Sequence, residues 1–186
     1  MRNERLKMMI VSALFAAIIA VFAQITIPLP FTAVPITGQT LAIGLAATIL
    51  GSRYGTLSVA IYLLLGAVGA PVFAGMSGGL GALVGPTGGY LVGFLPTAFL
   101  IGYYLEKTSF TVKQAIVANV IGMIVTLAFG TAWLKFAAEL AWTAAITGGA
   151  TPFIPVGILK AVLAAAGGIA VRNRLKAARL LTVQTH

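Results

Sequence analysis

One lysine lies inside an apolar, helix-length stretch near the C-terminus, and it is the strongest candidate for binding chemistry. Lys160 is the only ionisable residue in residues 152–171. A charge at that depth of a membrane-spanning helix costs a few kcal/mol on insertion scales, so it indicates a functional site by default. Without a carboxylate partner, the ammonium would suit an anionic or carbonyl-bearing ligand. The alternative is that its long stem reaches the outer interface.

Further candidate binding residues lie in or beside two uncharged segments rich in proline and glycine. The first is TIPLPFTAVPIT at residues 26–37, and the second is GAVGAPVFAGMSGGLGALVGPTGGYLVGF at residues 66–94. Aromatic walls with a few polar groups are typical of small-molecule sites, although each aromatic ring could instead be an interfacial anchor. Thr37 and Gln39 could hydrogen-bond a ligand or cap a helix. With Lys160, the candidate binding residues are Phe31, Thr37, Gln39, Phe73, Gly75, Ser77, Gly88 and Tyr90.

No constellation of residues predicts an enzyme or a metal site. The single histidine is His186, and the acids Glu4, Glu106 and Glu139 form no close pair. A metal ion would need clustered ligands, which the sequence does not provide. The glycine-rich segment also lacks the Gly-Lys-Ser/Thr ending of a phosphate loop. We therefore expect no catalytic residue, no cofactor and no ATPase within this chain.

Composition indicates an integral membrane protein. Of the 186 residues, 60% are hydrophobic and 8% charged, and the mean hydropathy is +1.05. The apolar stretches have helix length, whereas a transmembrane barrel needs many alternating segments of about 10 residues. The formal net charge of +9 comes from basic residues that flank apolar stretches. This distribution favours a lipid bilayer over nucleic acid as the partner.

The sequence predicts an all-α bundle of six transmembrane helices in a single domain. The expected helices cover residues 5–24, 38–51, 54–69, 88–104, 115–134 and 152–171, with a tight turn at residues 51–53. The expected outer loops are residues 26–37, 70–86 and 135–151, the first an ordered loop or short hairpin and the last including a short interfacial helix. The first apolar run of about 17 residues is longer than a signal-peptide core, so we expect it to be retained as a helix.

The charges predict the orientation. Six spans place both termini on one side, and the basic residues of that side are Arg2, Arg5, Lys7, Arg53, Lys107, Lys113, Arg172, Arg174, Lys176 and Arg179. Only Lys135 lies in an opposite-side segment. By the positive-inside rule both termini are cytoplasmic. The two Pro/Gly-rich loops then face outward together, where a substrate would enter.

Small residues recur on one side of the first helix. Ala13 and Ala17, and likewise Ala16 and Ala20, are spaced by four. Such a face lets another helix approach closely in lipid. Alanine is also common in membrane helices, so the spacing alone leaves both explanations open.

Three stretches together resemble the BioY family. They are PLPFTAVPITGQT at residues 28–40, APVFAGMSGGLGALVGPTGGYLVGF at residues 70–94 and FIPVGILKAVLAA at residues 153–165. The resemblance covers nearly the whole chain. It implies a six-helix biotin-binding S component of an energy-coupling-factor (ECF) transporter in a prokaryotic cell membrane. The implied partners are biotin, a transmembrane coupling subunit and two ABC-type ATPases.

The resemblance also implies roles for particular residues. The alanines at 13, 16, 17 and 20 would form the docking face for the coupling subunit, and the ligand would lie near the outer surface. One departure is Gly157, because some members resemble PGDLLK there, with an aspartate three residues before the lysine. Gly157 cannot supply that carboxylate. The alternatives are a stand-alone carrier that works without ATPases and a membrane enzyme.

Overall fold

The chain folds as an all-helical membrane protein, in a computed structural model that describes residues 2–178 and 181. Arg179 and His186 lie outside the described residues. Five of the described helices are long and apolar enough to cross a membrane. These are α1 (Arg2–Ala23), α2 (Gln39–Ala67), α4 (Gly88–Lys107), α5 (Val112–Ala137) and α7 (Phe153–Ala177). The expected class of fold, an all-helical membrane protein, is therefore confirmed.

Helix α2 consists of two antiparallel arms joined at Gly51. Gly51 has φ 82° and ψ −173°, a backbone conformation that is essentially restricted to glycine. In a straight helix, Gln39 and Tyr62 would lie about 34 Å apart, given a rise of about 1.5 Å per residue. Instead the Gln39 side-chain amide donates a 2.6 Å hydrogen bond to the Tyr62 hydroxyl. The reversal falls at the turn expected for residues 51–53, so the two arms correspond to the expected second and third helices.

Glu106, near the end of α4, stabilises this reversal. Its carboxylate accepts hydrogen bonds from the Ser52 backbone N–H at 2.7 Å and from the Ser52 hydroxyl at 2.6 Å. The first N–H groups of a helix have no partner within the helix, and a carboxylate satisfies them well. Glu106 therefore caps the second arm of α2 from a neighbouring helix.

Glycines let α4 pack closely against α5. A Cβ atom on Gly93 of α4 would lie 2.8 Å from the Cβ of Phe129, and one on Gly122 of α5 would lie 2.6 Å from Ile101 Cδ1. Both separations are shorter than real side chains tolerate. In lipid, close packing rather than the hydrophobic effect holds helices together, so these glycines are sites of contact.

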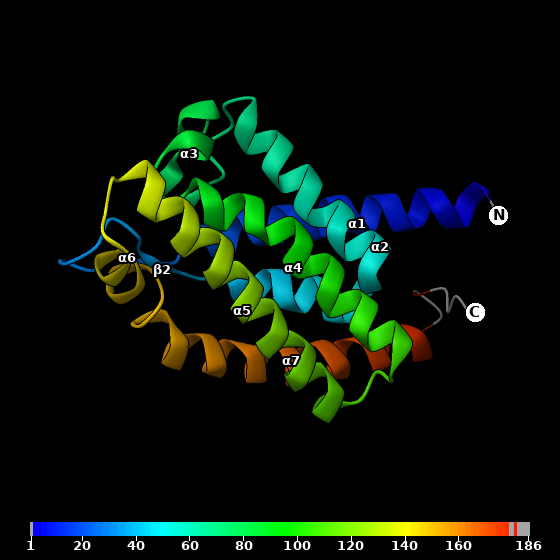
Figure 1. Cartoon of the computed structure of the whole chain (residues 1–186). Coiled ribbons are helices and arrows are strands. Elements are labelled where there is room, and N and C mark those ends of the chain that lie inside the picture. The colour runs from blue at the N-terminus through cyan, green and yellow to red at the C-terminus, as the bar shows by residue number, and fades with distance from the viewer. Residues whose placement is uncertain (1, 179–180, 182–186) are drawn as a thin grey trace.

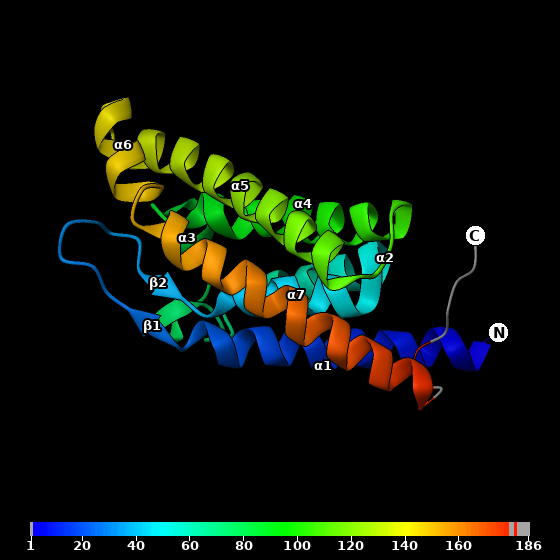
Figure 2. The same ribbon diagram turned by 90° about the horizontal axis from the view of Figure 1, so that it is seen from below.

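The short elements gather at one end of the bundle. The antiparallel strands β1 (Thr26–Ile27) and β2 (Ile36–Thr37), helix α3 (Leu80–Val84) and helix α6 (Trp142–Gly149) all lie at this end (Figure 1). The start of α1 and the end of α7 lie at the opposite end (Figure 2). A 3₁₀ turn (Ala74–Met76) precedes α3. The segments 26–37, 70–86 and 135–151, expected to be loops, thus contain these short elements.

The long helices extend beyond some of the expected ends. Helix α5 begins at Val112, where the Thr111 hydroxyl accepts a hydrogen bond from Gln114 N, and helix α7 continues to Ala177. We expected α7 to stop where charged residues begin. Charge ends a membrane span but not a helix, because arginine and lysine are good helix formers.

We predict that Gly51→Ala lowers the thermal stability of the detergent-purified protein. An alanine at this φ and ψ costs about 1–3 kcal/mol, and the change is measured as a fall in the melting temperature. The matched control is Gly167→Ala, because Gly167 has ordinary φ and a Cβ there would lie 3.4 Å from Leu45 Cδ2. Equal melting temperatures for the two variants would contradict the role given to Gly51.

Candidate functional site

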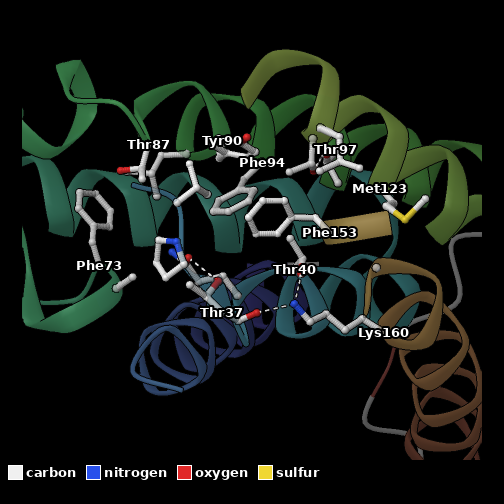
Figure 3. Close-up of a pocket in the computed structure, with 18 of the residues that line it drawn as sticks. Thr37, Thr40, Phe73, Thr87, Tyr90, Phe94, Thr97, Met123, Phe153 and Lys160 are labelled. Carbon is white, nitrogen blue, oxygen red and sulfur yellow. Dashed lines mark hydrogen bonds between the residues drawn. The ribbon is translucent and has the colours of Figure 1, made fainter. Parts of the chain in front are cut away.

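A cavity of about 330 Å³ lies between the short elements and the helices. Its lining residues come from the β1–β2 hairpin, the start of α2, the loop before α3, and helices α3, α4, α5 and α7 (Figure 3). Within the part of the chain that the structure describes, α1 and α6 contribute no lining residue. The cavity is therefore enclosed mainly by the helices that follow the first.

Four aromatic side chains line the cavity: Phe73, Tyr90, Phe94 and Phe153 (Figure 3). The rings of Tyr90 and Phe153 lie 6.4 Å apart between centroids. The Tyr90 hydroxyl donates a 2.6 Å hydrogen bond to Gly149 O, which links α4 to the end of α6. The four aromatic rings therefore form an apolar wall of the cavity, and the hydrogen bond fixes the orientation of the Tyr90 ring.

Lys160 provides the positive charge of the site. Its Nζ donates hydrogen bonds to Thr37 O at 2.7 Å and to Thr40 Oγ1 at 3.4 Å (Figure 3). Among the described residues that line the cavity, none is acidic. The Lys160 Nζ is therefore held by two neutral oxygens, and no carboxylate among the described lining residues competes for it.

A chain of polar contacts fixes the entrance of α2 against the aromatic wall. The Thr37 hydroxyl donates to Gln39 Oε1 at 2.8 Å, and Gln39 Nε2 donates to the Tyr62 hydroxyl at 2.6 Å. The Tyr62 ring then meets the Phe73 ring edge-to-face at 5.5 Å. Gln39 is 5% exposed, so its main contacts are within the protein. It positions the site as well as lining it.

The structure brings six of the nine predicted binding residues to the cavity. These are Thr37, Gln39, Phe73, Ser77, Tyr90 and Lys160. Phe31 is 64% exposed at the hairpin and does not line the cavity. Gly75 has φ 66° and shapes the loop before α3. Gly88 packs against Leu83 and Trp133 where α4 begins. A direct contact of Phe31 with a ligand would require the hairpin loop to move.

Sequence reasoning missed lining residues that recur along two helices. On α4 they continue from Tyr90 to Phe94, Thr97 and Ile101, and on α5 they are Asn119, Met123 and Thr126. Spacings of three and four place side chains on one helical face. That periodicity was available in the sequence, but each residue alone is an ordinary member of a membrane helix.

Gly157 lines the cavity one helical turn before Lys160, and Met123 takes the space that a side chain at this position would need. A Cβ on Gly157 would overlap Met123 Sδ and lie 2.9 Å from Met123 Cγ. The two residues face each other across the α5–α7 contact. The Met123 thioether therefore occupies the space beside Gly157, the position at which the resemblance implied an aspartate in some family members.

The alanines of α1 divide between two surfaces. Ala13 and Ala17 are exposed, Ala20 is half-buried, and Ala16 is fully buried against the bundle. Only Ala13 and Ala17 therefore offer a small-residue face to another protein, whereas Ala16 supports the packing of α1.

The fold defines a multi-pass membrane protein, and its cavity has the size of a small-molecule pocket. The BioY family model matches residues 1–177, so the chain belongs to the BioY family. It is 42% identical to the biotin transporter BioY2 of Lactococcus lactis, over 94% of this chain and 95% of that protein. It is also 42% identical to the biotin transporter BioY of Thermotoga maritima, over 86% of this chain and 92% of that protein.

A solved structure has the same fold. It is the crystal structure of the S-component for biotin from an ECF-type ABC transporter, with a TM-score of 0.85 and 32% identity. The match covers 93% of this chain and 94% of that one. The family expected from the sequence is therefore confirmed.

We predict that the effect of Gly157→Ala on stability depends on Met123. Alanine favours a helix over glycine by up to about 1 kcal/mol, but here the added methyl group displaces Met123. Gly157→Ala should therefore lower the melting temperature of the otherwise unchanged protein and raise it in a Met123→Ala background. A double-mutant cycle measures this coupling, expected at about 0.5–3 kcal/mol. Additive effects would contradict the contact.

Proposed function

We propose that this chain is the biotin-binding S component of an ECF-type transporter, which captures biotin for ATP-driven uptake. The observation that carries the proposal is the aromatic cavity with the Lys160 ammonium in its lining. This cavity occurs in a chain of the BioY family that superposes on a biotin S-component over 93% of its length. The chain itself acts as a binder and not as an enzyme.

The chemistry of the cavity suits biotin. Its volume of about 330 Å³ lies at the small end of the range for ligand pockets, as a vitamin requires. The fused rings of biotin would lie between Phe73, Tyr90 and Phe153. An ammonium has three N–H donors, and two of those of Lys160 are hydrogen-bonded within the protein. A further donor is left for an oxygen of the ureido or carboxylate group.

The orientation in the membrane follows from charge. The end where α1 begins and α7 ends also holds the α2 reversal and the α4–α5 connection, with Arg53, Lys107 and Lys113. We assign this end and both termini to the cytoplasm by the positive-inside rule. Counting the two arms of α2 separately gives six membrane-embedded helical segments. The cavity end then faces outward, in a prokaryotic cell membrane.

Partner subunits would supply the energy for transport. We propose that the exposed face of Ala13 and Ala17 on α1 docks onto a transmembrane coupling subunit associated with two ABC-type ATPases. Two features support this: α1 contributes no described residue to the cavity, and both alanines are exposed. Docking would therefore leave the binding site unobstructed. No cofactor is required.

We predict that Lys160→Met weakens biotin binding to the purified protein by about 10- to 100-fold, because a hydrogen bond to a charged group contributes about 1.5–3 kcal/mol. Isothermal titration calorimetry gives the dissociation constant. The matched control, Lys113→Met, removes an exposed lysine far from the cavity and should bind like the unchanged protein. If the unchanged protein binds no biotin, the proposed substrate is wrong. If Lys160→Met binds biotin with unaltered affinity, Lys160 does not contribute to the binding site.

We predict that Ala13→Trp with Ala17→Trp prevents co-purification with the coupling subunit and ATPases while biotin binding is retained. Two indole rings would keep a second helix from approaching α1. Leu163→Trp on α7 is the control, because Leu163 is 50% exposed and lies on another helix. An intact complex with the double tryptophan variant would refute this docking face. Uptake in a host without any coupling subunit would indicate a stand-alone carrier.

A further inference from the structure

We propose that Gln24 is a positioning residue for biotin binding, because its side chain holds the loop that carries Phe73 into the cavity. This inference rests on the proposed function. Gln24 follows α1 directly and does not line the cavity. Nothing in the sequence pattern distinguishes it from a residue that simply ends a helix.

Both the nitrogen and the oxygen of the Gln24 side-chain amide hydrogen-bond the backbone of the loop. Nε2 donates to two carbonyl groups of the loop, Phe73 O at 3.1 Å and Val72 O at 3.4 Å. It also donates to Ala20 O of α1 at 3.0 Å. Oε1 accepts a 2.9 Å hydrogen bond from the Met76 backbone N–H. Carbonyl groups only accept and a backbone N–H only donates, so the orientation of the amide is determined by its partners.

The loop needs this support because its backbone is strained. Gly75 and Met76 have φ 66° and 58°, and Met76 is one of two described non-glycine residues with positive φ. The left-handed conformation is unfavourable for a residue with a side chain. The N–H that Gln24 binds belongs to this strained residue. Other hydrogen bonds of the loop include those from Phe73 N to Ser77 O at 2.9 Å and from Gly79 N to Gly66 O at 2.7 Å.

The position of Phe73 depends on this backbone. Its side chain is 1% exposed and packs on Tyr62 and Gly66 while it lines the cavity. Gln24 holds the backbone carbonyl group of Phe73 itself. The amide therefore helps to set the position from which the Phe73 side chain extends into the cavity. Losing these bonds would let the loop move away from the cavity, and bound biotin would leave faster.

The arrangement also joins two surfaces that are otherwise separate. The same helix that presents Ala13 and Ala17 ends at Ala23, and the next residue, Gln24, hydrogen-bonds the loop before α3. At the end of α1, the Gln24 side chain bonds directly to Phe73, a residue that lines the cavity. Movement of α1 would therefore reach the cavity through this amide.

Two variants separate the contacts. Gln24→Met keeps the length of the side chain and removes every hydrogen bond. Gln24→Glu keeps an acceptor for Met76 N–H and loses donation to Phe73 O. The matched control is Gln114→Met, because Gln114 is also a bonded, half-buried glutamine, accepting from the Tyr104 hydroxyl at 3.0 Å at the opposite end of the bundle.

The measurements are the biotin association and dissociation rates and the hydrogen exchange of residues 72–79. We expect Gln24→Met to raise the dissociation rate about tenfold, because the loop loses its hydrogen bonds to the Gln24 side chain. Association should change little, and exchange should rise in residues 72–79. Gln24→Glu should be intermediate, and Gln114→Met should match the unchanged protein.

The outcome separates this inference from the proposed function. If the unchanged protein binds biotin and Gln24→Met releases it at the same rate, the positioning role is wrong and the proposed function stands. Faster release with unchanged exchange in residues 72–79 would also contradict it, because the loop would not be the cause. If the unchanged protein binds no biotin, the proposed function fails, and the exchange experiment alone then decides whether Gln24 holds the loop.

Discussion

The site depends on one constraint, an ammonium group within a membrane-embedded helix and without an acidic residue among the described lining of its cavity. Lys160 is satisfied by the carbonyl of Thr37 and the hydroxyl of Thr40, both at the junction of β2 and α2. That junction lies within hydrogen-bond distance of Lys160 on α7, and Thr37 there also pairs with Thr26 of β1. Lys160 Nζ is thus held by neutral oxygens and meets no carboxylate among the described lining residues, and such a buried lysine indicates a functional site.

The second constraint is that backbone groups inside a membrane need partners wherever a helix is interrupted. At the Gly51 reversal Glu106 supplies one, and at the loop before α3 Gln24 supplies three contacts. Because these side chains come from neighbouring helices, each interruption also ties two elements together. The fold therefore leaves α1 outside the cavity lining and still connects it to Phe73.

Much of this architecture could be predicted from the sequence, since long apolar runs, glycines and prolines indicate helices and their ends directly. The all-helical membrane fold and the family are confirmed, and the expected turn at residues 51–53 coincides with the reversal at Gly51. Contacts between distant segments could not be predicted. The sequence does not reveal that Met123 occupies the space beside Gly157, that Ala16 is buried while Ala17 is exposed, or that Phe31 is exposed and does not line the cavity. These depend on how helices rotate and cross.

The most direct test of the account is an experimental structure of the purified chain with biotin bound. We expect biotin between Phe73, Tyr90 and Phe153, with one of its oxygens within hydrogen-bond distance, about 3 Å, of Lys160 Nζ. Either end of biotin satisfies this prediction, and the structure would settle which end meets the ammonium. Biotin bound outside this cavity, or inside it with Lys160 turned away, would contradict the account.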